Sequence, residues 1–506
     1  MIEIDGEHLT LEKIVEVCRQ REKIRISSHS YQKIKQSHEN LLNLVNRDIP
    51  LYGINTGFGI FANEKIPIEQ NLKLNKNLIL SHAVRIGNPL LEEAVRATMC
   101  IRINSFAKGL SGIQIEVVET LVNMLNEGVT PLVLDQGSLG SSGDLNLLAQ
   151  MALVISKDSE DREDQSGQAY FHGQLMSGKQ AMRSAGIERV ELQHKDGLAL
   201  INGATFSAAL GSLAVMDAQL CLKIANTVCA LSAEANLARR AAFHPQYHAA
   251  RNLPGQILVA KDIHELLSGS TLTDSHPHVQ DPYSIRCAPQ VHGAILDTIE
   301  FVKNTVEKEI NAATDNPLII GDEVISGGNF HGEPLAFGMD FLGIALTELS
   351  AISERRTYLL LDSKLNNGLP EMLISPGSEP GLNSGVMIPQ YTAASLVLEN
   401  RTLAAPDSVQ SLPTSGGQED HNANAMNAAR HTIQIVRNTL KVLAIEIFTA
   451  VRAIHLRLML NPEKKLGNET EKIYAKITDI APFREEDNLW SEDIEKISQL
   501  IKNNEI

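Results

Sequence analysis

The stretch Ala208-Ala-Leu-Gly-Ser-Leu-Ala-Val215 belongs to a long run of helical periodicity that covers residues 204–240. Its side chains are apolar around most of a helix circumference, which indicates burial between other helices. Four more long helical runs follow, at 291–313, 334–361, 385–402 and 423–460. The last run would extend roughly 55 Å if it were unbroken. These runs predict a mainly α fold with an elongated helical bundle at its core, and such apolar helices indicate oligomerisation.

Before residue 204 the pattern changes, and short helical runs alternate with Gly-rich loops. Examples of these runs are Leu11–Arg19, Glu69–Ser81 and Leu91–Phe106. No linker rich in Pro, Gly or Ser divides the chain, so the boundary is taken from the periodicity. The sequence predicts a loop-rich N-terminal region, 1–203, and a long-helix bundle domain, 204–506. The polar stretch 157–166 is expected to be an exposed loop and not a binding segment.

Composition excludes several classes of protein. A net charge of −16 over 506 residues argues against a nucleic acid or an anionic membrane as partner, because both require a basic face. The five cysteines form no CxxC pair and no zinc spacing, so we expect no metal site. Four of them lie in apolar helical contexts, where we expect reduced core residues. The N-terminus lacks the order of a signal peptide, and no uncharged apolar stretch reaches membrane-spanning length. We expect a soluble, cytoplasmic protein.

The segment Gly137-Ser-Leu-Gly-Ser-Ser-Gly-Asp-Leu-Asn-Leu-Leu-Ala-Gln150 can build an electrophile from its own backbone. The Gly143 nitrogen can attack the Ser141 carbonyl carbon and close a five-membered ring, because glycine leaves its nitrogen unshielded and bends tightly. Loss of water, including the Ser142 hydroxyl, would leave a 4-methylideneimidazol-5-one (MIO). The same residues also fit an ordinary turn with Asp144 as the cap of the following helix. Taken alone, the segment leaves both interpretations open.

Five further segments accompany this one in a fixed order. They read Leu51-Tyr-Gly-Ile-Asn-Thr-Gly-Phe-Gly59, Gly197-Leu-Ala-Leu-Ile-Asn-Gly203, Gln280-Asp-Pro-Tyr-Ser-Ile-Arg-Cys287, Ser326-Gly-Gly-Asn-Phe-His-Gly332 and Gln418-Glu-Asp-His421. From about Leu9 to the C-terminus, the chain resembles the histidine and aromatic amino-acid ammonia-lyases. The resemblance implies a carbon–nitrogen lyase whose MIO forms autocatalytically from Ser141, Ser142 and Gly143, with no external cofactor. It also implies a homotetramer whose active sites draw residues from more than one subunit.

Elimination of ammonia requires an electrophile for the amine, a base for the β-proton and a cation for the carboxylate. The resemblance implies that Tyr52 is the base and that Asn202 forms hydrogen bonds near the ring. It places Tyr283 against the ring or the departing amine. Arg286 offers a planar fork for a carboxylate. From the residues alone, Tyr52 also fits a packing tyrosine, Asn202 a turn residue and Arg286 a structural ion pair.

Two positions bear on the choice of substrate. His82 and Glu419 follow the histidine-specific branch, and a carboxylate suits an imidazole N–H but not a bare phenyl ring. A lone histidine in a helical apolar stretch is more often a packing residue. The resemblance also places Asn329 and Phe330 beside the substrate, with Gln280 as an orienting group. The pairing of His82 with Glu419 favours histidine as substrate.

The chain departs from the family pattern at or near the expected pocket. Ser141 stands where the ring-forming triad usually begins with Ala, and its hydroxyl would sit beside the ring. The other departures are Asn202-Gly-Ala-Thr205, Asp144-Leu-Asn-Leu147 and Ser415-Gly-Gly-Gln418. They raise the chance of a modified histidine or another amino acid as substrate.

The favoured function is elimination of ammonia from L-histidine to give urocanate. The alternatives are a 2,3-aminomutase, a lyase for another aromatic amino acid, and an eliminase for a histidine betaine. A catalytically silent helical scaffold would lack the site residues, yet Tyr52, Ser142, Arg286 and Glu419 are all present. A helical tetramer of the fumarase type, which eliminates without the ring, does not match the six motifs.

Overall fold

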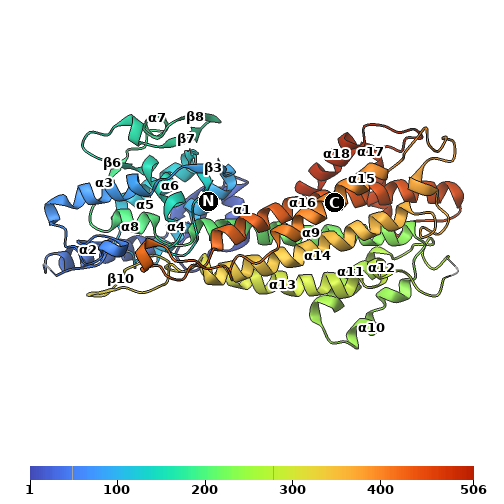
Figure 1. Cartoon of the computed structure of the whole chain (residues 1–506), viewed down its shortest axis with the longest axis horizontal. Helices are drawn as coiled ribbons and strands as arrows, with labels where there is room; N and C mark the ends of the chain where they lie inside the picture. The colour runs from blue at the N-terminus through green and yellow to red at the C-terminus, as the bar shows by residue number, and fades with distance from the viewer. Residues whose placement is uncertain (48, 277) are drawn as a thin grey trace. The chain divides into compact units, whose positions relative to one another are not determined.

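The computed structural model describes residues 1–47, 49–276 and 278–506, and the mainly α fold class is confirmed (Figure 1). The described chain forms two compact units. The first comprises residues 1–214, 303–340 and 406–430, and the second comprises 215–302, 341–405 and 431–506. These units differ from the contiguous segments 1–203 and 204–506 that the periodicity predicts, because two later stretches of chain pack with the first unit.

The first half of the chain forms short helices and short strands. The helices are α1 (Leu11–Cys18), α2 (Ser28–Val45), α3 (Asn71–His82), α4 (Glu92–Ala107), α5 (Ile115–Glu127), α6 (Leu145–Ile155), α7 (Gly178–Ser184) and α8 (Asp196–Ile201). The strands of the chain are β1 (Ile2–Ile4), β2 (Ile24–Ile26), β3 (Ile86–Pro89), β4 (Thr130–Pro131), β5 (Leu134–Gln136), β6 (Ser156–Lys157), β7 (Gln168–Phe171), β8 (Gln174–Ser177), β9 (Val190–Glu191), β10 (Leu318–Ile320) and β11 (Glu323–Ile325). β1 and β2 pair in parallel, as do β6 and β9, and the pairs β3–β5, β4–β7, β7–β8 and β10–β11 are antiparallel.

The long helical runs form helices close to the predicted bounds. The remaining helices are α9 (Thr205–Ala235), α10 (Pro245–Ala249), α11 (Pro254–Leu266), α12 (Tyr283–Arg286), α13 (Ala288–Glu309), α14 (Glu333–Leu361), α15 (Met387–Leu403), α16 (Ala425–Leu460), α17 (Asn468–Ile480) and α18 (Trp490–Lys502). Local signals set several ends of the helices. Thr10 and Ser27 cap α1 and α2 through their hydroxyl groups, and α5 ends at Gly128 in the left-handed conformation.

A buried polar cluster joins three helices of the second unit. Glu446 on α16 accepts hydrogen bonds from Ser232 on α9 and from Ser353 and Arg356 on α14, and the Arg356–Glu446 ion pair is completely buried. Removing one partner of such a pair typically costs about 3–5 kcal/mol, since it leaves an uncompensated buried charge. The cluster therefore fixes the register of these three helices.

Helices α9 and α14 are long and apolar enough to cross a membrane by length and composition. In each helix, however, 72% of the apolar window is buried inside the protein. Burial of this kind is typical of the core helices of a soluble protein. The cysteines Cys18, Cys100, Cys221 and Cys229 are buried and free, as the sequence predicts.

Candidate active site

A cavity of about 850 Å³ lies within the first unit and gathers loops that are far apart in the sequence. We call it the site cavity. The lining residues that bear on the chemistry are Tyr52, His82, Ser141, Ser142, Asn202, Phe330, His331, Glu419 and His421. The structure thus brings together seven residues that the sequence singles out for the site, from five of the six motifs and from the end of α3. Asn329 precedes Phe330 but is not among the lining residues.

The backbone of Gly143 is held in a conformation that requires glycine. Gly143 has φ +83° and forms an isolated parallel bridge with Gly203. A Cβ atom at this position would lie 2.1 Å from the nitrogen of Gly203. No other residue fits, because such a contact is far inside van der Waals distance and the left-handed region disfavours L side chains. The glycine that ring closure requires is therefore also required by packing.

Asp144 is completely buried beside this segment. Its carboxylate accepts hydrogen bonds from the hydroxyls of Ser138 and Ser207, at 2.8 and 3.0 Å, and from the backbone nitrogen of Ser207, at 2.8 Å. Burial raises the pKa of the Asp144 carboxyl, and the hydrogen bonds from Ser207 and Ser138 oppose that rise. The sequence predicts that Asp144 caps the following helix α6, and this is wrong for its side chain, which makes no capping bond there. It binds instead the first turn of α9, so it ties the ring-forming segment to that helix.

The two adjacent serines have different surroundings. The buried Ser141 hydroxyl donates to the Leu139 carbonyl at 3.2 Å and accepts from the Ala423 backbone nitrogen at 2.8 Å. The Ser142 side chain is partly exposed in the site cavity, and its carbonyl accepts from the Asn202 amide nitrogen at 2.8 Å. This geometry leaves Ser142 as the serine whose hydroxyl can depart, whereas Ser141 is held in place.

Asn202 presents an unpaired acceptor at the same position. Because its amide nitrogen donates to the Ser142 carbonyl, the orientation of the amide group is fixed. Its Oδ1 atom is buried and has no hydrogen-bond partner among the described residues. A buried acceptor without a partner is costly. A ligand that carries an ammonium group would satisfy it.

His82 lies at the C-terminal end of α3 with its ring fixed. Its Nδ1 atom lies 2.8 Å from the Leu78 carbonyl, which can only accept a hydrogen bond, so Nδ1 carries the proton. Nε2 is then an acceptor for a ligand in the site cavity. Burial lowers the pKa of His82, and the Leu78 hydrogen bond and the Glu419 charge act in the opposite direction. The neutral imidazole is therefore the favoured form.

Tyr52 and Glu419 lie close enough to interact electrostatically. Burial raises the pKa of the Tyr52 phenol, a hydrogen bond from the Gly59 backbone lowers it, and the Glu419 carboxylate raises it. One oxygen of Glu419 accepts from the Thr414 hydroxyl at 3.1 Å. The other carboxylate oxygen can accept from a ligand, because no described residue is within bonding distance of it.

Two histidines that line the site cavity, His331 and His421, are not among the residues predicted for the site from the sequence. The rings of His331 and His421 stack with centroids 6.0 Å apart and an angle of 7° between their planes. His331 Nε2 also lies 3.3 Å from the His421 carbonyl. Both residues stand inside motifs already quoted, next to Phe330 and two residues after Glu419. Their position inside those motifs is the sequence feature that could have identified them as site residues.

The remaining predicted residues lie in the second unit. Gln280, Tyr283 and Arg286 do not line the site cavity. Arg286 donates from Nε to the Asp281 carbonyl at 2.8 Å, and its guanidinium lies 4.5 Å from the centre of the Tyr283 ring. Tyr283 is 70% exposed. The first unit therefore supplies the ring-forming segment and the residues near it. Arg286, the predicted cation for a substrate carboxylate, does not line the site cavity.

Comparisons with known proteins show the family to which the chain belongs. The family model for aromatic amino acid lyases matches residues 9–479. The histidine ammonia-lyase of Treponema denticola is 46% identical, over 100% of this chain and 97% of its own length. The structure of histidine ammonia-lyase from Trypanosoma cruzi has a TM-score of 0.90 and 36% identity, covering 100% of this chain and 94% of that one. Tyrosine aminomutase from Streptomyces globisporus has a TM-score of 0.92 and 33% identity, covering 100% and 97%. The chain belongs to the aromatic amino acid lyase family and is a carbon–nitrogen lyase.

Proposed function

We propose that the protein eliminates ammonia from L-histidine to give urocanate. The observation that carries this proposal is the presence of His82 and Glu419 in one cavity with Ser142. The Treponema denticola relative, named as a histidine ammonia-lyase, supports the same assignment. A site with a carboxylate and an imidazole acceptor binds a ring that carries N–H groups and discriminates against a phenyl ring, because phenyl leaves both polar groups unpaired.

We propose that Ser141, Ser142 and Gly143 form the MIO ring, and the local structure fits it. Only glycine is compatible with the contact at Gly203, and Ser142 is the serine with an uncommitted hydroxyl. The ring would supply an electrophile that improves the departure of the amino group. Asn202 holds the Ser142 carbonyl in place, and Asp144 anchors the segment to α9.

The residues of the chain then divide the remaining tasks. The Asn202 Oδ1 atom accepts a hydrogen bond from the substrate ammonium group. Tyr52 removes the β-proton, which requires its phenolate form and hydrogen-bond reach of the β-carbon. His82 Nε2 and Glu419 orient the imidazole, and Phe330 excludes water on the side where it lines the cavity.

We propose that Gln280, Tyr283 and Arg286 complete the site as residues of a neighbouring subunit in a cytoplasmic homotetramer. What supports this is the exposure of Tyr283 and the lack of a carboxylate-binding arginine in the lining of the site cavity among the described residues. Arg286 would bind the substrate carboxylate through its fork. Asn329 would flank the substrate from the Phe330 loop.

A second candidate is a 2,3-aminomutase, which the likeness to tyrosine aminomutase favours. A lyase releases the amine, whereas a mutase returns it to the β-carbon of the same skeleton. A panel of L-histidine, L-phenylalanine, L-tyrosine and a histidine betaine, analysed for unsaturated product and β-amino acid, separates these functions. Urocanate and free ammonia from histidine support the proposal. A β-amino acid, or no urocanate from protein whose ring is formed, contradicts it.

A further inference from the structure

A second cavity, of about 390 Å³, lies in the first unit beside the site cavity. Its wall is built from α3, the end of α6, the paired strands β6 and β9, and the loop after β6. Leu72, Ile79, Leu80, Leu153 and Leu192 give it an apolar side. The loop belongs to the polar stretch 157–166, so Asp158, Asp161, Arg162 and Gln165 line a cavity that the sequence did not predict. A cavity of this volume is in the range of small-molecule sites.

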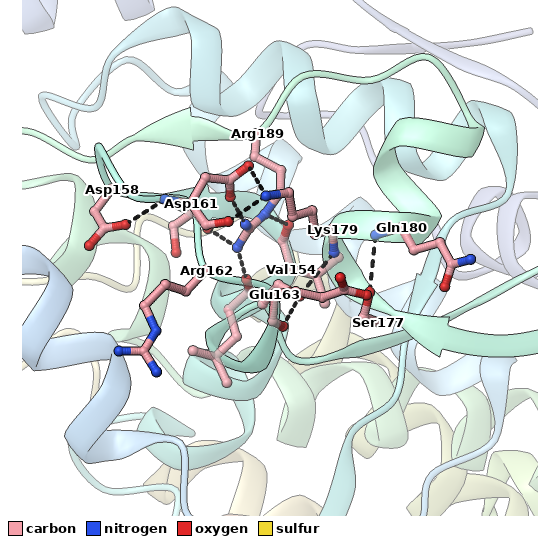
Figure 2. A network of polar contacts seen from close by, with 12 residues as sticks. Val154, Asp158, Asp161, Arg162, Glu163, Ser177, Lys179, Gln180 and Arg189 are labelled. Atoms are coloured by element: carbon pink, nitrogen blue, oxygen red, sulfur yellow. Dashed lines mark hydrogen bonds and ion pairs between the residues drawn. The ribbon is translucent and has the colours of Figure 1, made fainter.

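Much of the charge in the loop forms a fixed internal network (Figure 2). The guanidinium of Arg189 is buried, contacts the Asp161 carboxylate and donates to the Leu153 carbonyl at 2.8 Å and the Val154 carbonyl at 3.1 Å. Lys179 donates to the Asp161 carbonyl at 2.6 Å. The Asp158 carboxylate contacts Lys76 on α3, and this ammonium holds the pKa of Asp158 below its ordinary value. These bonds hold the loop in place, so it forms one wall of the cavity.

The charge that is left over is positive. Five cations line the cavity against three carboxylates, namely Lys73, Lys76, Lys157, Arg162 and Arg189 against Asp158, Asp161 and Glu191. Lys73 and Lys157 have no carboxylate partner among the described residues, whereas Arg162 pairs with Asp164 at 2.6 Å and in Figure 2 points away from the Asp161 network. The lining carboxylate Glu191 forms no ion pair with a described residue, so these groups leave one positive charge in excess. The Oε1 atom of Gln165 is buried and unpartnered within the same part of the structure. An anion with an apolar body would match the two lysines and the apolar side, and a polar group on it would satisfy Gln165.

The two cavities share their helices. On α3, Lys73 and Lys76 line the second cavity, His82 lines the site cavity, and Asn77 lines both. On α6, Leu153 lines the second cavity and Leu145 lines the site cavity, directly after the ring-forming segment. A ligand in the second cavity therefore contacts the helix that positions His82 and the helix that follows Ser142.

We propose that the second cavity binds a small carboxylate with an apolar body, and that its occupancy alters turnover in the site cavity through α3 and α6. The carboxylate contacts Lys73 and Lys157, and the apolar body packs on the leucines of α3 and α6. The binding step is independent of the proposed function. The effect on turnover rests on the proposed function only because its measurement needs a substrate that the enzyme converts.

The binding test is a calorimetric titration of the full-length protein with benzoate, benzamide and inorganic phosphate. Benzamide keeps the apolar body without the charge, and phosphate keeps the charge without the apolar body. We expect benzoate to bind about 10-fold or more tightly than either, since both groups contribute. No benzoate binding up to about 10 mM, which corresponds to less than about 3 kcal/mol of affinity, overturns the proposal. Equal binding of benzamide or phosphate overturns the assigned chemistry.

The location is tested with the double variant Lys73→Gln/Lys157→Gln. We expect it to weaken benzoate binding about 10-fold or more, because it removes both unpaired charges. The matched control, Lys33→Gln/Lys35→Gln on α2, removes the same charge from a helix that does not line the cavity, and it should bind benzoate like the wild type. Benzoate binding that the lysine pair leaves unchanged belongs to another site and overturns the proposal.

The coupling is tested by turnover at saturating substrate, where a competitor for the site cavity is displaced. Benzoate should change kcat in the wild type and in the α2 control, but not in Lys73→Gln/Lys157→Gln. An unchanged kcat in wild-type protein that binds benzoate at these lysines overturns the coupling. A failure to convert histidine would contradict the proposed function instead, and would leave the titration result intact.

Discussion

In the site cavity the Asn202 Oδ1 atom has no hydrogen-bond partner among the described residues, whereas in the second cavity Asp158 and Asp161 are both bound by cations. The first region keeps reactive groups open, namely the Ser142 hydroxyl, His82 Nε2 and one oxygen of Glu419. In the second region most of the charged groups hold a loop in place, and two lysines, Lys73 and Lys157, have no carboxylate partner among the described residues. Groups that are paired fix the shape of a region, and groups that are left unpaired show which ligand it can take.

The largest expected effect separates the two serines of the site cavity. Ser142→Ala removes the hydroxyl that must leave, so the ring cannot form and turnover should fall by about 1000-fold or more. Peptide mass spectrometry should show the wild-type peptide that spans Ser141–Gly143 lighter by two water molecules, and the Ser142→Ala peptide at its unmodified mass. Ser141→Ala is the matched control, since its hydroxyl is not needed for closure. An unmodified peptide in fully active wild-type protein would exclude the ring.

Tyr52→Phe tests whether the Tyr52 phenol is the base that removes the β-proton. The change removes a proton acceptor that is needed only during turnover, so kcat should fall by about 100-fold with little change in KM. Burial raises the pKa of Tyr52 above its ordinary value, so the phenolate is the minor form at neutral pH. Its fraction grows as pH rises. The kcat/KM of the wild type should therefore rise toward alkaline pH, and this alkaline dependence should disappear in Tyr52→Phe. A variant with wild-type turnover would rule Tyr52 out as the base.

How far the sequence predicts the molecule depends on whether a feature is local. The long helices follow from apolar periodicity, and α9 and α16 lie within a few residues of their predicted bounds. Tyr52, Asn202 and Glu419 stand in short motifs, and the resemblance to the histidine-specific branch singles out His82. All four line one cavity.

Features that depend on contacts between distant parts of the chain do not follow from local sequence patterns. Asp144 was expected to cap α6, but the fold brings Ser207 to its carboxylate, and no local pattern encodes that approach. The stretch 157–166 is exposed over much of its length, as the sequence predicts, but its contacts with Lys76 and Arg189 join positions far apart in the sequence, and no local pattern encodes them. Tyr283 and Arg286 stand in a motif like the other site residues, but they lie in the second unit and do not line the site cavity.

Glu419→Gln tests the discrimination that the site cavity is proposed to make. The variant keeps the shape of the side chain and loses its charge, so histidine turnover should fall by about 10-fold while discrimination against phenylalanine narrows. Glu39→Gln on α2 removes the same charge from an exposed residue that does not line the site cavity, and it should change both quantities little. The measurement is kcat/KM for the two substrates in each variant. Unchanged discrimination in Glu419→Gln would mean that this carboxylate does not bind the substrate ring.

The last prediction concerns stability, at Ser141. Ser141→Ala removes the acceptor of the Ala423 backbone N–H, which is buried just before α16. Leaving such a donor unpaired costs about 1–3 kcal/mol, so the free energy of unfolding should fall by about that amount while the ring still forms. Ser212→Ala on α9 is the matched control: this hydroxyl donates to the Ala208 carbonyl, and its loss leaves no N–H unpaired, so the cost should be smaller. Chemical denaturation of both variants measures the difference. Equal stability of the two would mean that the Ser141 hydroxyl does not hold the ring-forming segment to the chain that follows Glu419.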